Sequence, residues 1–294
     1  DYLAAEGFGG ILAVGQGSER PPRLVEIKSR GRRSGRRVVL IGKGVTYDSG
    51  GLSLKPADSM ALMKTDMAGA AAVAGAMIAY ARDAGRNRDA EVIALLPMAE
   101  NSPSGSAYRP GDIIRHFGGG TTEVSNTDAE GRLLLADALS YARERLAPHV
   151  MVDIATLTGA ATLGLSRHFA ALYANNDDLA FELIEAGVES GDALWRLPLV
   201  DAYRQHLKTP VADIAQAVSE PADRAGSIMA ALYLQHFVGD VPWAHIDMAG
   251  PARADKQRGE HPVGATGFGA RLLAEWLRTA DLGSDEPRSD SAER

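Results

Sequence analysis

The chain has 294 residues, of which 45% are hydrophobic and 23% charged, so it holds enough apolar material for a sizeable core. Its net charge of −7 argues against a protein that coats nucleic acid or lies on a membrane surface. It has no cysteine, which excludes disulfides and thiolate metal sites and suits a reducing, cytoplasmic compartment.

The sequence lacks signals for membrane insertion or export. The longest apolar stretch, residues 68–80, is shorter than the roughly 18–20 residues of a membrane span and contains two glycines. The first residues lack a charged segment followed by an apolar signal core, and they lack an initiator methionine. We therefore expect a cytoplasmic protein that does not bind membranes, and a chain cut from a longer polypeptide.

Strand-like and helix-like patterns alternate along the chain. Short apolar runs predict buried strands at residues 24–28, 38–41, 91–98, 149–157 and 243–249. Longer periodic segments predict helices at residues 67–84, 132–146, 179–189, 200–207, 225–238 and 266–280. This alternation predicts an α/β fold with a mixed, mostly parallel sheet flanked by helices. With no repeat and no linker in the sequence, we expect one catalytic domain over residues 1–282.

Two further segments are mainly charged. The run R-G-R-R-S-G-R-R at residues 30–37 lies between two predicted strands and holds two glycines, so we interpret it as an exposed hairpin loop. A nucleic-acid contact is the less favoured interpretation of the same run. Residues 283–294 are polar, charged and without periodicity, which predicts a disordered tail.

Charged residues gather in two glycine-rich segments, G-K-G-V-T-Y-D-S-G-G at 42–51 and N-T-D-A-E-G-R at 126–132, and in the stretch at 55–69 between them. Seven of them stand out: Lys43, Asp48, Lys55, Asp66, Asp128, Glu130 and Arg132. Four clustered carboxylates need compensating cations, and hard divalent ions favour oxygen ligands. Two such ions about 3.5–4 Å apart activate a shared water, so the pattern predicts a two-metal hydrolase.

The positions of the carboxylates support one shared site. Lys43 and Asp48 follow a predicted strand, at the sheet edge where α/β proteins place their sites. Asp128 and Glu130 are two positions apart, so on an extended segment they would point to the same side. Asp66 precedes a predicted helix, where it could instead be a simple N-terminal cap.

The two other charged residues also have simpler interpretations. Lys55 could be an ordinary exposed lysine, and Arg132 could pair with a surface carboxylate. Each residue is ambiguous alone, and only their joint occurrence favours the metal site.

Other chemistries fit the sequence less well. A P-loop would need Ser or Thr at position 44 and Gly at position 37, where the chain has Gly44 and Arg37. The seven histidines form no H-E-x-x-H pair, which argues against a thermolysin-like zinc site. We interpret His245 as a core histidine with satisfied hydrogen bonds. The chain also lacks a G-x-S-x-G elbow and a cysteine nucleophile.

At these motifs the chain resembles the leucyl aminopeptidase family (cytosol aminopeptidases, peptidase family M17). N-T-D-A-E-G-R-L at 126–133 is similar to the family signature, and G-V-T-Y-D-S-G-G-L-S-L-K-P at 44–56 to its other hallmark. The likeness runs from residues 10–18 to residues 264–273. It implies hydrolysis of N-terminal residues from peptides and a homo-hexamer in the intact protein. The family's additional N-terminal domain has no counterpart in this chain.

The resemblance also implies a role for each candidate ligand. Asp48 and Glu130 would bridge two divalent ions, either zinc or manganese, with magnesium or cobalt as alternatives. Lys43, as an unprotonated amine, and Asp66 would complete the tighter site. Asp128 would complete the more exchangeable one.

The remaining roles concern the substrate and the proton transfers. Lys55 would stabilise the developing oxyanion, and Arg132 would hold a bicarbonate ion as a proton shuttle. Met63 would line the pocket for the first side chain, which suits leucine-like or methionine-like residues. Leu157 and Gly159 would hold the peptide through their backbone.

Two other functions stay open on the residues alone. One is a two-metal hydrolase that acts on other amides or on phosphate esters. The other is a non-catalytic oligomerisation or DNA-binding module that uses the basic run at residues 30–37.

Overall fold

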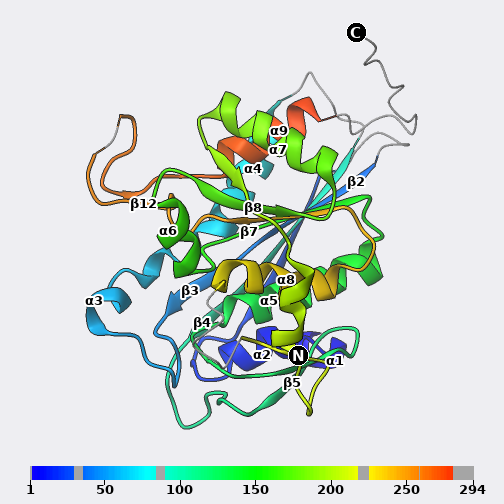
Figure 1. The fold of residues 1–294 in the computed structure, drawn as a ribbon, viewed down its shortest axis with the longest axis vertical. Coiled ribbons are helices and arrows are strands. Elements are labelled where there is room, and N and C mark those ends of the chain that lie inside the picture. Colours follow the sequence, from blue (N-terminus) through cyan, green and yellow to red (C-terminus); the bar gives the residue numbers. More distant parts are fainter. Residues whose placement is uncertain (1, 30–35, 84–89, 218–224, 258, 281–294) are drawn as a thin grey trace.

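A large mixed sheet forms the centre of the computed structural model, which describes residues 2–29, 36–83, 90–217, 225–257 and 259–280 (Figure 1). Eight strands of the described chain belong to it: β1 Arg23–Ser29, β2 Arg37–Gly42, β3 Gly44–Asp48, β4 Glu91–Asn101, β7 Val150–Ala155, β8 Ala170–Ala174, β9 Leu194–Arg196 and β11 Trp243–Asp247. Their order is β1-β4-β2-β7-β11-β8-β9, and β3 also pairs with β4.

The central strands β4, β2, β7 and β11 run parallel to one another. The strands β1 and β8 are antiparallel to β4 and β11, and β9 is parallel to β8. The predicted α/β fold with a mixed, mostly parallel sheet is therefore confirmed.

Helices cover both faces of this sheet (Figure 1). The helices of the described chain are α1 Tyr2–Glu6, α2 Gly9–Gly15, α3 Ala57–Met60, α4 Ala68–Arg82, α5 Gly131–Tyr141, α6 Gly159–Leu165, α7 Asp177–Ser190, α8 Gly226–Val238 and α9 Ala270–Thr279. Shorter turns of helix are η1 Met63–Thr65, η2 Ala142–Leu146 and η3 Asp201–Leu207. On β2, Val38 and Leu40 face the core under α4, α7 and α9, whereas Val39 and Ile41 face the core under α2, α5 and α8. Burial on both faces explains the continuous apolar runs in the sequence.

The other described strands form two small sheets. β5 Ile113–Arg115 pairs with β6 Thr121–Glu123, which pairs with β10 Ile214–Ala215. The second sheet joins β12 Arg253–Ala254 to β13 Gly264–Ala265.

Several predicted elements have different bounds or types in the structure. The helix predicted at 266–280 begins only at Ala270, because residues 264–265 pair in β13 and Gly269 precedes α9 with a left-handed φ of 88°. The helix predicted at 132–146 changes after Tyr141 into the π-helical turn η2. The segment at 200–207 is the 3-10 helix η3.

The hairpin interpretation of residues 30–37 is wrong. β1 and β2 are not neighbours, because β4 lies between them and pairs with both. Residues 30–35 lie outside the described residues, as do the predicted tail and the predicted domain boundary at residue 282. The single domain and the disordered tail therefore stay predictions.

One helical stretch, Ala57–Arg82, has the length and composition of a membrane-spanning helix. A core helix of a globular protein passes the same test, and so this is weak evidence. The structure divides the stretch into α3, η1 and α4, and α4 packs against the sheet through residues such as Val73 and Met77.

Candidate metal centre

Two of the candidate ligands, Lys43 and Asp48, lie at the carboxyl ends of strands, as the sequence predicts. Asp48 is the last residue of β3, and Lys43 connects β2 to β3. The Lys43 backbone is fixed on two sides, because its N–H donates to Ile154 O at 3.1 Å and its carbonyl accepts from Ala70 N at 2.8 Å. The chain direction at the end of β2 therefore aims the Lys43 side chain toward the site.

Glu130 reaches the same place from the N-terminus of α5. Lys43 Nζ lies 2.8 Å from Glu130 Oε1 and 2.8 Å from Asp66 Oδ1. The residue after Glu130 is Gly131, and a Cβ at that position would lie 2.6 Å from Lys43 Nζ. Only glycine leaves room for the lysine there.

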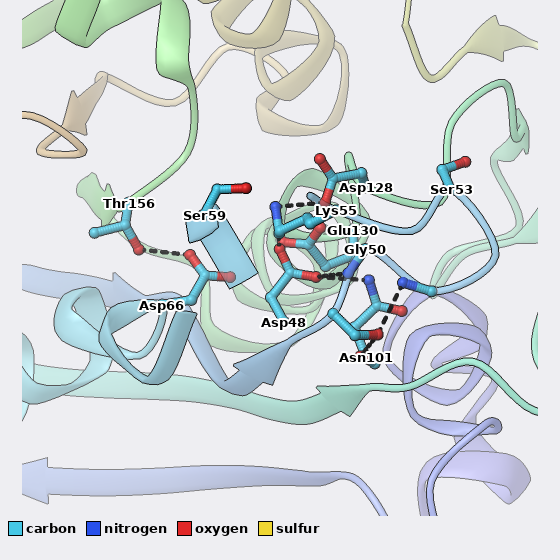
Figure 2. Close-up of polar contacts among 12 residues, drawn as sticks. Asp48, Gly50, Ser53, Lys55, Ser59, Asp66, Asn101, Asp128, Glu130 and Thr156 are labelled. Atoms are coloured by element: carbon cyan, nitrogen blue, oxygen red, sulfur yellow. Dashed lines mark hydrogen bonds and ion pairs between the residues drawn. The ribbon is translucent and has the colours of Figure 1, made fainter. Parts of the chain in front are cut away.

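Three of the carboxylates converge on one point. Asp48, Asp128 and Glu130 each offer an oxygen atom, and these atoms lie within 4.8 Å of one another. Figure 2 shows their side chains pointing toward one another, with Asp66 beside them. The structure therefore brings all four predicted carboxylate ligands together.

One expectation about local geometry is wrong, and one alternative interpretation is excluded. Asp128 and Glu130 do not lie on an extended segment, because Asp128 is in a turn and Glu130 has the helical angles φ −63° and ψ −38° just before α5. The turn and the helix start bring the carboxylates together instead. Asp66 is not a helix cap, because α4 has no side-chain cap bond and the Asp66 carboxylate binds Lys43 and Thr156.

Lys55 is part of the cluster and is not an ordinary exposed lysine. Its Nζ lies 2.8 Å from Asp48 Oδ2 and also contacts Asp128 Oδ1 (Figure 2). Its side chain is 14% exposed.

The donor set fits divalent cations. With all four carboxylates ionised the cluster has a formal charge of −4 + 2 = −2, because the ammonium groups of Lys43 and Lys55 carry +2. Two buried oxygens, Asp66 Oδ2 and Glu130 Oε2, have no hydrogen-bond partner among the described residues. Buried oxygens without a partner are costly, and a cation at this point would satisfy them.

Burial and crowding shift the pKa values of these groups. Burial raises the pKa of Asp66 to about 6 and that of Glu130 to about 8, although Lys43 opposes both shifts. Burial alone would lower the pKa of Lys43, but the surrounding carboxylates, Asp66 first, outweigh it and raise this pKa well above its usual range. The lysine is an ammonium ion in this arrangement, and a dication that bound its amine would have to displace the proton.

Arg132 lies behind the cluster and is not a surface ion pair. It is 8% exposed, its Nη1 donates to Gln216 O at 2.6 Å, and its guanidinium lies 5.9 Å from the ring centre of Tyr233. Its buried Nε has no partner among the described residues. Burial lowers its pKa.

A cleft of about 610 Å³ opens onto the carboxylates, within the size range of small-ligand sites. Met63, Leu157 and Gly159 line it, together with Asp48, Lys55, Asp66, Asp128 and Glu130. Lys43 and Arg132 are not among the described residues that line it. All three residues expected to contact substrate therefore border the same cleft as the carboxylates.

The sequence analysis missed the residues that hold this geometry. Asn101, the last residue of β4, donates from Nδ2 to Asp48 Oδ1 at 2.8 Å and to Thr127 O at 2.9 Å. Thr156 donates to Asp66 Oδ1 at 2.8 Å, and its carbonyl accepts from Lys43 Nζ at 3.0 Å. Asn101 follows an apolar strand, so the strand-end rule that found Asp48 could have found it too.

Asp247, the last residue of β11, fixes the loop that borders the cleft. Its Oδ1 accepts from the N–H groups of Leu157 at 3.1 Å and Thr158 at 3.3 Å, and its Oδ2 accepts from Thr158 Oγ1 at 2.6 Å. His245, on the same strand, is fully buried with its Nδ1 2.6 Å from Asp153 Oδ1. The core position predicted for His245 is therefore confirmed, but the prediction that its hydrogen bonds are satisfied is wrong for Nε2, which has no partner among the described residues.

The fold and the cluster define an α/β protein with a carboxylate-rich candidate cation site, and comparison with known proteins gives its family. A model described as "Cytosol aminopeptidase family, catalytic domain" matches residues 1–274. The chain therefore belongs to this family.

Individual relatives agree with this assignment. A "Probable cytosol aminopeptidase" of Syntrophotalea carbinolica is 51% identical over 278 residues, which cover 94% of this chain and 54% of that protein. A protein of the same description from Roseiflexus castenholzii is 50% identical, and the match covers 94% of this chain and 56% of that protein. The structure of "Bottromycin maturation enzyme BotP in complex with Mn" is similar with a TM-score of 0.87 and 45% identity, covering 94% of this chain and 60% of that one. The chain spans about half the length of these curated relatives.

Proposed function

We propose that this chain is the catalytic part of a metal-dependent aminopeptidase that removes N-terminal residues, leucine-like ones preferred, from peptides. The observation that carries the proposal is a cleft lined by four carboxylates and Lys55, with Lys43 bound to two of these carboxylates and with buried oxygens that lack partners among the described residues. Membership in the cytosol aminopeptidase family supports the same activity.

Two divalent ions would balance the four carboxylates. Asp48 and Glu130 would bridge them, Lys43 and Asp66 would complete one site, and Asp128 the other. When bound, such ions lower the pKa of a water and polarise a carbonyl. Manganese or zinc would suit the site, and the complex of BotP with Mn favours manganese.

The protein's own residues would bind and orient the peptide. The free amine of the substrate would enter the acidic cluster, and this would restrict cleavage to the first residue. Met63 would contact the first side chain, and the backbone of Leu157 and Gly159 would align the peptide. Lys55 would stabilise the negative charge that develops on the carbonyl oxygen.

Arg132 would serve proton transfer as the binding group for a bicarbonate ion. Its buried guanidinium, with Nε unpartnered among the described residues, supports an anion at this position. For the intact protein we propose a cytoplasmic homo-hexamer that includes the family's N-terminal domain.

Assays with an aminoacyl amide test the function. After loading with Mn²⁺, the protein should hydrolyse leucine amide and leave an aryl phosphate intact. Lys55→Ala should lower kcat by about 10²–10³-fold, because it removes a charge that stabilises the oxyanion. Lys64→Ala is the matched control, since Lys64 is exposed and is not among the described residues that line the cleft. Unchanged turnover in Lys55→Ala, or faster hydrolysis of the phosphate, would contradict the proposal.

A further inference from the structure

The cleft has a second group of charged residues, on the wall that α6 and β12 provide. Arg167 follows α6, and Arg253 is the first residue of β12. Among the described residues that line the cleft, every other charged side chain belongs to the candidate metal centre. The cleft therefore combines a carboxylate cluster with a pair of guanidinium groups.

Asp255 holds the two arginines together from outside the cleft lining. Arg167 Nη1 lies 2.5 Å from Asp255 Oδ2, and Arg253 Nη1 lies 2.6 Å from Asp255 Oδ1. These three groups, two guanidinium ions and one carboxylate, together carry a formal charge of 2 − 1 = +1. Because Asp255 contacts both groups, it fixes them beside each other at the cleft wall.

The arginine side chains are shielded without being closed off from solvent. That of Arg253 is 21% exposed and that of Arg167 is 35% exposed. Both also line an adjoining cavity of about 180 Å³, next to His168 and His261. Asp192 lines this cavity too, but it is buried and already pairs with Arg271 at 3.3 Å.

We propose that Arg167 and Arg253 form a subsite for a carboxylate of the substrate, an inference that rests on the proposed aminopeptidase function. A short peptide carries a positive amine at one end and a carboxylate elsewhere, which matches the charges of this cleft. Guanidinium groups bind carboxylates through paired N–H donors, and partial shielding strengthens such contacts beyond those of exposed ion pairs. Three carboxylates have this chemistry: an acidic first side chain, an acidic second side chain and a free C-terminus.

Matched substrate pairs separate these three sources. They are glutamate amide against glutamine amide, Leu-Glu amide against Leu-Gln amide, and Leu-Gly against Leu-Gly amide. The readout is the ratio of kcat/KM for the acidic member to that for the neutral member, measured with the Mn²⁺-loaded full chain. The variants are Arg253→Met and Arg167→Met, with Arg253→Lys to keep the charge and Arg20→Met as an exposed control.

In at least one pair, either Met variant should lower this ratio about tenfold, which corresponds to the loss of one charged hydrogen bond. The kcat/KM of the neutral member should stay within about twofold, because the arginines would not contact the reacting bond. Arg253→Lys should retain most of the ratio, and Arg20→Met all of it. Equal ratios in wild type and both Met variants, for all three pairs, would overturn the subsite.

A binding measurement keeps this test separate from that of the proposed function. Analogues with a –CH2–NH– link in place of the first peptide bond are not hydrolysed, so calorimetric titration gives their affinities directly. If wild type binds the acidic analogue more tightly and Arg253→Met loses that difference, the subsite holds even without turnover. If wild type hydrolyses the neutral substrates but shows no such difference, the aminopeptidase function holds and the subsite fails.

Discussion

Glu130 and Asp66 hold protons in the folded, metal-free protein at pH values where an unfolded chain has released them. Their pKa values lie at about 8 and about 6, above the ordinary 4.5 and 3.8, mainly because both side chains are buried. Proton binding by the folded state stabilises it fully below the unfolded pKa values. This stabilisation is lost as the pH rises through the folded ones.

We therefore expect the Tm of the metal-free protein to fall as the pH rises from 6 to 9, mainly through ionisation of Glu130. Thermal unfolding followed by circular dichroism checks this. Glu130→Gln should flatten the dependence, because a glutamine binds no proton, whereas Glu19→Gln, at an exposed position, should not. If the Tm of Glu130→Gln fell with pH as steeply as that of the wild type, other groups would be responsible for the pH dependence.

At the scale of elements, the loop between β7 and α6 connects the candidate metal centre to the wall of the cleft that α6 provides. Thr156 binds Asp66 and Lys43 at one end, and Asp247 accepts hydrogen bonds from the next two residues at the other. The position of this loop therefore depends on the ends of two parallel strands, β7 and β11.

Asp247→Asn should loosen this loop, because the amide nitrogen of asparagine cannot accept the Thr158 hydroxyl proton. We expect a loss of about 1–3 kcal/mol in the free energy of unfolding. We also expect KM for leucine amide to rise more than kcat falls, because the loop would align the peptide backbone. Steady-state kinetics and urea unfolding measure both quantities, with the exposed Asp240→Asn as the control. A normal KM would show that the loop keeps its position without Asp247.

Elements with strong apolar patterns could be predicted from the sequence, whereas weakly patterned ones could not. The run V-V-L-I at 38–41 is buried on both faces and was recognised as a strand. β8 is also fully buried, but its sequence A-A-L-Y-A is rich in alanine, which has little strand preference. α6 contains two glycines in seven residues and was missed for a similar reason. Tertiary packing determines such elements.

The charged residues of the site could be predicted, but most of their partners could not. Lysine and carboxylates in glycine-rich segments are unusual enough to be noticed along the chain. The contact between Asn101 and Asp48 joins residues 53 positions apart, and that between Asp247 and Leu157 joins residues 90 apart. Such pairs depend on strand order, which local pattern does not specify.

At the scale of the whole molecule, the two cores of the protein meet at the sheet, and the candidate metal centre lies where the strands end. Candidate ligands from β3, the residue after η1, the turn before α5 and the β2–β3 connection all converge there. A bound cation would therefore link segments that are distant in sequence, and it would stabilise the folded state by an amount that rises with the logarithm of its concentration over its Kd.

Removal of metal with a chelator should abolish leucine amide hydrolysis and lower the Tm. At free metal 100-fold above its Kd, linkage predicts about 2.7 kcal/mol of added stability. Reloading with Mn²⁺ should restore both properties, and plasma emission spectrometry should find about two ions per chain. Full activity in the chelated protein would contradict the proposed function.

The lysine ammonium groups between the carboxylates have a consequence for how the protein acquires metal. Lys43 and Lys55 each contact two of the acidic side chains, so a cation that bound these carboxylates would compete with an ammonium group. Loading would then exchange protons for ions. The affinity for Mn²⁺ should therefore rise with pH, which titrations at two pH values would measure.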